Sequence, residues 1–262
     1  CFRQMQEECI SPDTTSFVCC LKACGMIPAI TIGEELHRKI EKCGISASKD
    51  LALGNSLLHM YAKCGMLEKA HEVLEELSLD DVVTWNTLMA GYAHMGHARG
   101  VLTLFAKMME GDVVPNRISF LVLLTTCSHV GLVEEGQKVL DMMDNIYSFT
   151  PSLEHYACMV DLFSRAGRLD KAIIIIEKVP SPDRIQLWLA FLGACQKWMN
   201  VELGIWAFHQ ALELDPNRAS AYVCMGNIYA AVGMQKEAEK MITHWRTTNA
   251  NMEGNSRIFA WR

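Results

Sequence analysis

Apolar residues recur along this chain with the three-to-four-residue spacing of α-helices. That spacing places them on one face of a helix, which can then be buried against a neighbour. No segment shows the strict alternation of a half-buried β-strand. Two of the apolar stripes are Val101, Leu102, Leu104, Phe105 and Met108, and Leu169, Ala172, Ile173 and Ile176. The pattern predicts an all-α protein.

One short phrase recurs five times, first as YAKCGMLEKA at 61–70 and last as YAAVGMQKEA at 229–238. The interval between Gly131 and Gly167, for example, is 36 residues, and a period near this value indicates a helical repeat array. The longer interval before Gly233 divides at Asn200, which is predicted to adopt the left-handed conformation that ends a helix. The repeat glycines are Gly65, Gly96, Gly131, Gly167 and Gly233.

Each repeat glycine separates two helical patterns, so each unit is a helix–turn–helix. A single pair of helices cannot bury its apolar stripe alone, and neighbouring pairs must stack. The fold class predicted is therefore all-α, a superhelical α-solenoid of stacked helix–turn–helix repeats.

Composition restricts the function. A formal charge of −6 counts against a polyanion-binding protein, because nucleic-acid modules are usually basic. The 11 cysteines are scattered over predicted helices, so reduced, buried thiols are expected rather than a disulfide framework. Cys20 and Cys24 lack partners for a zinc site. No metal, no cofactor and no membrane partner is expected.

Longer stretches resemble the plant pentatricopeptide repeat family, in its PLS class, which cycles long (L), short (S) and ordinary (P) motifs. GNSLLHMYAKCGMLEKAHEVLEEL (54–77) is similar to an S motif and VVTWNTLMAGYAHMG (82–96) to a P motif. AYVCMGNIYAAVG (221–233) is similar to the second of two E motifs. The resemblance covers essentially the whole chain and implies a right-handed superhelix.

The resemblance implies this division of the chain: 1–13, tail of a preceding P repeat; 14–50, L; 51–81, S; 82–116, P; 117–152, L; 153–184, S; 185–218, first E motif; 219–252, second E motif; 253–262, a tail similar to the start of a deaminase-linked segment. Further repeats are expected upstream.

In this family the fifth and last residues of a repeat read one RNA base. Carried over, the resemblance gives Asn55 with Asp81, a pair that favours uridine, and Asn86 with Asn116, which leans to cytidine. An amide or carboxylate can pair with a base edge. The alternative for Asn55 and Asn86 is helix-start capping, where asparagine is common.

The second position of a repeat is expected to wedge between bases, which gives Val83 and, more weakly, Ala52. Trp85 and Trp188 are expected to pack between helices. The weaker base-reading candidates are Val18 with Asp50, Leu121 with Ser152, and Ala157 with Asp183 or Arg184.

No catalytic signature is present. A deaminase needs His-x-Glu and Pro-Cys-x-x-Cys, and neither occurs. The chain is expected to be no enzyme but a specificity factor for single-stranded organelle RNA, in mitochondrion or chloroplast. The expected process is C-to-U editing, with editing-complex proteins or a deaminase as further partners. The alternative is a helical-repeat protein scaffold, or a structural ribonucleoprotein subunit that reads no bases.

Overall fold

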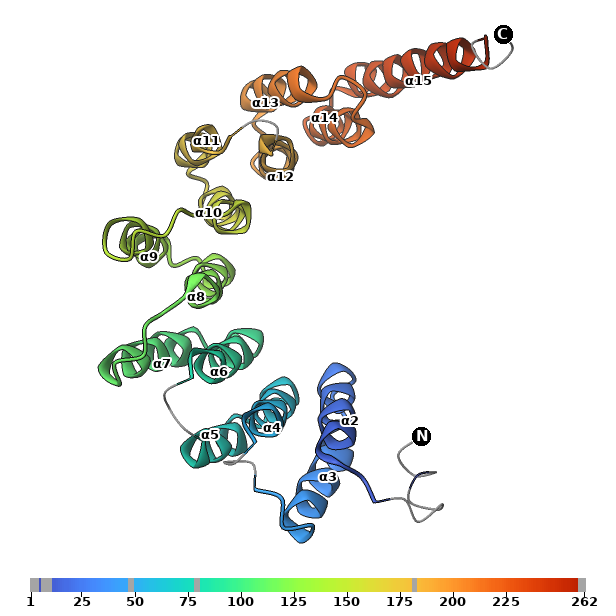
Figure 1. Cartoon of the computed structure of the whole chain (residues 1–262). Helices are drawn as coiled ribbons and strands as arrows, with labels where there is room; N and C mark the ends of the chain where they lie inside the picture. The colour runs from blue at the N-terminus through green and yellow to red at the C-terminus, as the bar shows by residue number, and fades with distance from the viewer. Residues whose placement is uncertain (1–4, 6–10, 47–49, 78–80, 181–182, 259–262) are drawn as a thin grey trace. The chain divides into compact units, whose positions relative to one another are not determined.

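A computed structural model describes residues 5, 11–46, 50–77, 81–180 and 183–258, with side chains as far as Arg246. Over these residues the chain forms helices and turns and no strand (Figure 1). The all-α helical repeat fold predicted from the sequence is confirmed. The chain divides into two compact units, Cys1–Val130 and Gly131–Arg262.

In the first unit, the first helix of each pair packs on the first helix of the next, so α2, α4, α6 and α8 form one row. Each second helix packs on the first helix of its own pair, so the second helices lie along one side of this row (Figure 1). We call these the A helices and the B helices. The A helices are α2 (Thr14–Met26), α4 (Leu51–Lys63), α6 (Val82–His94) and α8 (Arg117–Val130), and the B helices are α3 (Ile30–Lys42), α5 (Leu67–Glu76) and α7 (Ala98–Glu110).

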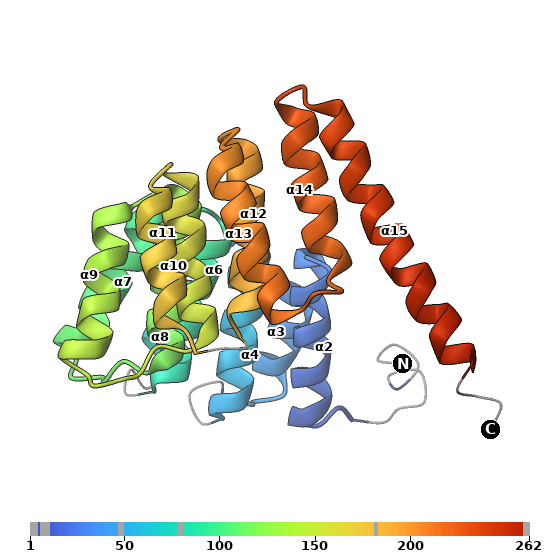
Figure 2. The same ribbon diagram turned by 90° about the horizontal axis from the view of Figure 1, so that it is seen from above.

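The second unit repeats the arrangement. Its A helices pack in the order α10, α12, α14, each with its B helix behind it, and α9 packs on α10. The last pair, α14 and α15, lies side by side and antiparallel (Figure 2). The bounds are α9 (Val133–Asn145), α10 (Leu153–Arg165), α11 (Leu169–Lys178), α12 (Arg184–Lys197), α13 (Val201–Leu214), α14 (Ala219–Ala231) and α15 (Gln235–Ile258).

The turn between the helices of a pair is built by the repeat glycine. Gly65 has φ +78°, which L-residues with a side chain rarely adopt, and the other four repeat glycines lie between +73° and +82°. This geometry lets Met66 N donate to Tyr61 O at 2.9 Å, the bond that closes a Schellman turn. The predicted role of these glycines is confirmed.

The prediction for Asn200 was wrong. Asn200 has φ −91°, and the left-handed residue is Met199, with φ +53°. Asn200 instead begins α13, where its side chain accepts from Leu203 N at 3.0 Å. Asparagine suits both positions, and here the N-cap satisfies a backbone donor that would otherwise lack a partner.

The predicted apolar stripes form the core. Val101, Leu104 and Phe105 are buried, whereas Ile175 is buried where Ile173 was expected. Trp85 and Trp188 are also buried, as expected of packing residues.

The described cysteines are all free thiols. Burial raises the pKa of Cys195 to about 12 and raises the pKa of Cys24 as well, so both stay protonated at neutral pH.

Helix pairs begin at Thr14, Leu51 and Val82 in the first unit, at the starts assigned to the L, S and P repeats. Most of the expected repeat tail at 1–13 lies outside the described residues. Of the expected deaminase-linked tail, 253–258 continue α15, and 259–262 lie outside the described residues.

Candidate nucleic-acid interface

The predicted pair Asn55 and Asp81 is brought together in the first unit. Asn55, in the second turn of α4, donates from Nδ2 to Asp81 Oδ2 at 3.3 Å. The Thr84 hydroxyl, 2.7 Å from Asn55 Oδ1 and 2.9 Å from Asp81 Oδ2, completes a three-residue network. Sequence reasoning did not identify Thr84.

The carboxyl group of Asp81 is ionised in this network. Burial works to raise its pKa, but hydrogen bonds from Thr84, Val83 and Asn55 outweigh burial and leave the pKa below its ordinary value. A negative acceptor therefore lies beside the Asn55 amide at neutral pH.

The second predicted pair, Asn86 and Asn116, is also joined. Asn86 Nδ2 donates to Asn116 Oδ1 at 3.1 Å. Asn86 is only 6% exposed, and its Oδ1 finds no hydrogen-bond donor among the described residues. An unsatisfied buried carbonyl oxygen costs about 1–3 kcal/mol, so this acceptor favours a ligand that donates to it.

The capping alternative does not hold for Asn55 and Asn86, because both lie inside their helices. It does hold for the last residues of the repeats at 14–50, 51–81, 82–116 and 117–152. Asp50, Asp81 and Asn116 accept from backbone N–H groups at the starts of α4, α6 and α8, at 3.0–3.1 Å. Ser152 forms a capping box with His155 at the start of α10.

Two grooves open between the A helices of the first unit. One, of about 510 Å³, is lined by Val18, Ala52 and Asn55 among others. The other, of about 250 Å³, is lined by Asn86. Val83 lines both and is 53% exposed, so its side chain stands between the groove beside Asn55 and the groove beside Asn86, where the sequence placed a wedge.

Ile118, which sequence reasoning missed, lines the second groove and is 58% exposed. It occupies the second position of the 117–152 repeat, as Val83 does in the 82–116 repeat. That shared register is the signal that identifies it.

The charged residues lining these grooves are basic. Lys22 lines the first groove, Lys63 the second, and His59 both, with no carboxylate among the described lining residues. Partial burial, with Lys63 and Lys22 nearby, lowers the pKa of His59, so its imidazole is neutral at pH 7.

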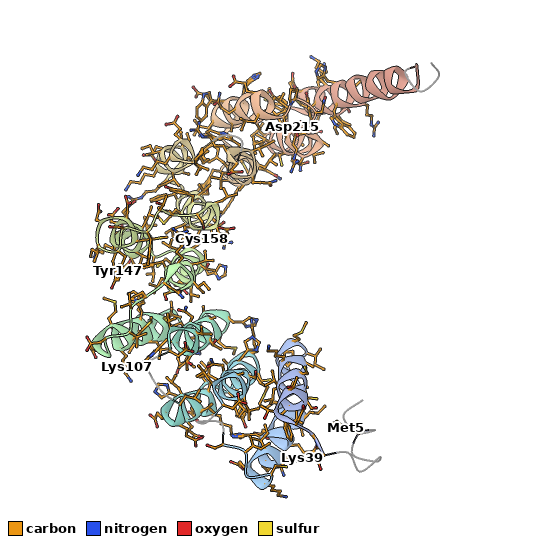
Figure 3. All side chains as sticks on the ribbon, in the orientation of Figure 1. Met5, Lys39, Lys107, Tyr147, Cys158 and Asp215 are labelled. Atoms are coloured by element: carbon orange, nitrogen blue, oxygen red, sulfur yellow. The ribbon has the colours of Figure 1, made fainter. Side chains whose placement is uncertain are left out.

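Acidic residues gather instead on the B helices. A groove of about 420 Å³ between α3 and α5 is lined by Glu34, Glu41, Glu72 and Glu76, together with fewer basic groups. In this groove Lys69 pairs with Glu34. Outside it, Lys39 on α3, labelled in Figure 3, pairs with Glu35 at 2.8 Å. Net charge is thus a poor guide to the A-helix face.

The structure does not join the residues of the weaker base-reading candidates into pairs. Val18 lines a groove, while Asp50 caps α4. Leu121 is half-buried on α8 of the first unit, and Ser152 belongs to the second.

In the 153–184 repeat there is no amide pair. Ala157 is half-buried on α10, near the labelled Cys158 of Figure 3, and Asp183 is exposed before α12 without a side-chain cap bond. Arg184 donates to the carbonyls of Val179 and Glu177 at the end of α11, which leaves its guanidinium committed to the fold.

None of the described helices is long and apolar enough to cross a bilayer. The His, Cys, Asp and Glu side chains of the described residues form no group of three that is arranged to hold a metal ion.

Family models match along the chain. The PPR repeat family model matches residues 80–129, the PPR repeat model residues 55–82 and 154–181, and the E motif model residues 198–254. Together these matches take in more than half of the chain.

Curated relatives come from Arabidopsis thaliana. Pentatricopeptide repeat-containing protein At2g20540 is 34% identical over 95% of this chain and 46% of its own length. The chloroplastic At3g49170 is 37% identical over 91% and 28%, and the mitochondrial At1g77170 is 34% identical over 92% and 51%. The chain thus spans about half or less of these relatives.

Solved structures show the same fold at low identity. The maize pentatricopeptide repeat protein PPR10 aligns with a TM-score of 0.63 at 19% identity, over 94% of this chain and 36% of its own. Its complex with an 18-nt psaJ RNA element aligns with a TM-score of 0.68 at 18% identity, over 95% and 42%. From its repeats and its E motif, the chain belongs to the plant pentatricopeptide repeat family, in the E-motif PLS class.

Proposed function

We propose that this chain is a sequence-specific binding factor for single-stranded RNA in organelle RNA processing, most specifically in C-to-U editing. The observation that carries the proposal is the pairing of Asn55 with Asp81 and of Asn86 with Asn116. Two successive A helices each present one such pair beside a groove, so one pair would face each of two successive nucleotides.

Charge on the A-helix face supports the same function. Lys22 and Lys63 stand beside the pairs, where they would contact the phosphates on either side of a read base. Basic residues also end α6, α8, α10 and α12, although the helix dipole favours cations there in any protein.

The relatives support the organelle and the partner. Some are named chloroplastic or mitochondrial, and PPR10 has been crystallised with an 18-nt psaJ RNA element. The E motif at 198–254 would connect the RNA-bound repeats to a deaminase, carried in the same protein or supplied by another. In this role the chain itself selects the site and catalyses nothing.

The test is binding of the 262-residue chain to single-stranded RNA at low salt, followed by fluorescence anisotropy. Two base contacts at about 1–3 kcal/mol each fall short of the roughly 8 kcal/mol of a micromolar complex, so weak binding is expected. An RNA with a uridine followed by a pyrimidine should bind better than one with purines at both places.

Replacing both Asn55 and Asn86 by alanine should remove that preference, with affinity falling about 30-fold or more. Asn227→Ala is the matched control, because Asn227 is exposed on α14 and lies away from both grooves. A wild-type chain that binds both RNAs equally, or a double variant that keeps the preference, would falsify the proposal.

The scaffold alternative is favoured by one observation, the glutamates between α3 and α5. A partner protein with a basic segment would fit there. Salt separates the two functions: RNA binding should fall steeply between 50 and 200 mM salt, because phosphate contacts release counterions. A flat salt dependence at low RNA affinity would favour the scaffold.

A further inference from the structure

The hydroxyl group of Thr84 lies at the centre of one reading position. Thr84 is fully buried at the start of α6, and its Oγ1 is 2.7 Å from Asn55 Oδ1 and 2.9 Å from Asp81 Oδ2. It belongs to the following repeat, so neither residue of the pair reveals it. We infer that Thr84 is a positioning residue that decides which base edge the Asn55–Asp81 pair reads; the inference rests on the proposed function.

The argument begins with the orientation of the amide. Asn55 Nδ2 donates to Asp81 Oδ2, and the Thr84 hydroxyl donates to Asn55 Oδ1. The ionised Asp81 carboxylate takes the NH₂ group of the amide, because a flipped amide would place its carbonyl oxygen against a negative charge. In that orientation the amide oxygen faces the Thr84 hydroxyl, which donates to it, so both ends of the amide are held.

The consequence concerns what the amide still offers to a base. The second N–H of Asn55 is left to donate, whereas one lone pair of its Oδ1 is occupied by Thr84. An outward N–H binds a keto oxygen, such as O4 of uracil, and has no acceptor in the amino group of cytosine. Thr84 therefore favours uridine at this position.

The neighbouring pair shows what happens without that hydroxyl bond. Ser119 holds the same place in α8 as Thr84 holds in α6. Its hydroxyl bonds Asn116 Oδ1 at 3.3 Å and accepts from Asn116 N at 3.1 Å. Among the described residues no donor reaches Asn86 Oδ1, which is buried, so a donor such as the cytosine amino group would find this oxygen unoccupied once the side chains that cover it move. Two asparagines in the same register thus favour opposite base edges.

The test is the ratio of affinities for two RNAs that carry uridine or cytidine at one nucleotide. That nucleotide is the one at which Asn55→Ala abolishes discrimination. Wild type should favour uridine there, and Thr84→Val, which keeps the shape and loses the hydroxyl, should lower the ratio about three- to tenfold. Thr84→Ser should retain the ratio, and Ser119→Ala should leave it unchanged.

A second measurement uses the unmodified chain and so does not depend on folding of a variant. Replacing the uridine by 4-thiouridine exchanges the keto oxygen for a weak acceptor and should lower wild-type affinity about threefold. An unchanged ratio in Thr84→Val together with unchanged affinity for the thio-RNA would overturn the inference while wild type still discriminates. If wild type discriminates at neither nucleotide, the proposed function itself is overturned.

Discussion

The repeats at 51–116 and the repeat at 153–184 share one scaffold and differ in the polar groups placed on it. In both regions, grooves of similar size open between adjacent A helices, about 250 Å³ beside Asn86 and about 290 Å³ between α10 and α12. The first region has two amide pairs and the second has Ala157 instead. Stacking of helices therefore produces the groove, and a few side chains decide which polar groups lie beside it.

Charge separates the two regions as well. His59, at the ninth residue of α4, has Asp161 as its counterpart in α10. Asp161 engages Arg165 at 2.8 Å, and both line the second groove together with Lys197. The second groove thus carries a carboxylate where the first has an imidazole, and its Arg165 is already paired, so we expect the second region to hold RNA less well than the first.

The largest expected effect tests the shared scaffold. A Cβ at Gly91 would lie 2.3 Å from Ala62 Cβ, so Gly91→Ala should lower the free energy of unfolding by about 1–3 kcal/mol. The matched substitution Gly193→Ala meets open space in α12 and should raise it by about 0.5–1 kcal/mol. Urea unfolding of both variants measures the difference. If both substitutions changed the free energy of unfolding equally, the close approach of α6 to α4 at Gly91 would be contradicted.

The next effect would remove the difference between the regions. Ala157→Asn introduces an amide at the reading position of 153–184, with Asp183 as the expected partner. It should create a base preference of about two- to tenfold at one further nucleotide. Ala157→Leu, similar in size without the amide, is the control in the same anisotropy assay. A preference that appears in both variants, or in neither, would count against reading at this position.

Whether a feature could be predicted from the sequence depends on how far apart in the chain its interacting residues lie. Helix pairs and Gly65-type turns were predictable, because periodicity and left-handed glycine are local properties. The pairing of Asn55 with Asp81 was predictable only through family resemblance. Thr84 was missed because its role depends on how one helix packs on the next. Ile118 shares the register of Val83 and could have been found from the sequence. The charge of −6 does not describe the grooves between the A helices, since it sums over faces that the fold separates.

A smaller effect concerns phosphate contacts. Lys63→Gln should reduce the slope of log affinity against log salt by about one and weaken binding alike for all RNAs. Asp161→Asn should increase that slope, because it releases Arg165 in the second region to contact phosphate. The affinity for RNA should rise about two- to threefold. Titrations at three salt concentrations measure both slopes. A change in base preference without a change in slope would show that Lys63 reads bases instead.

The smallest effect is a pH dependence of stability from His59. Its pKa is lowered in the folded chain, so below the ordinary value of 6.5 the unfolded chain binds the proton more readily. Stability should be fully present above about pH 6.5 and fall as the pH drops through the folded pKa, by less than about 1 kcal/mol for this partly exposed group.

The measurement is urea unfolding at pH 7.5 and 5.5. His59→Gln should reduce the slope of stability against pH between these values. The same slope in wild type and His59→Gln would contradict the assignment.

Helix capping by the final residues of the repeats at 51–81 and 82–116 limits which residues can be substituted there to change the proposed base preference. Asp81 and Asn116 begin the helix of the following repeat while facing the reading asparagine of their own. The residue types that suit this position are therefore the short polar ones that also start helices, namely aspartate, asparagine, serine and threonine. A residue that cannot cap, such as alanine, would lower the stability of the next helix by about 1 kcal/mol, whatever base it was chosen to recognise.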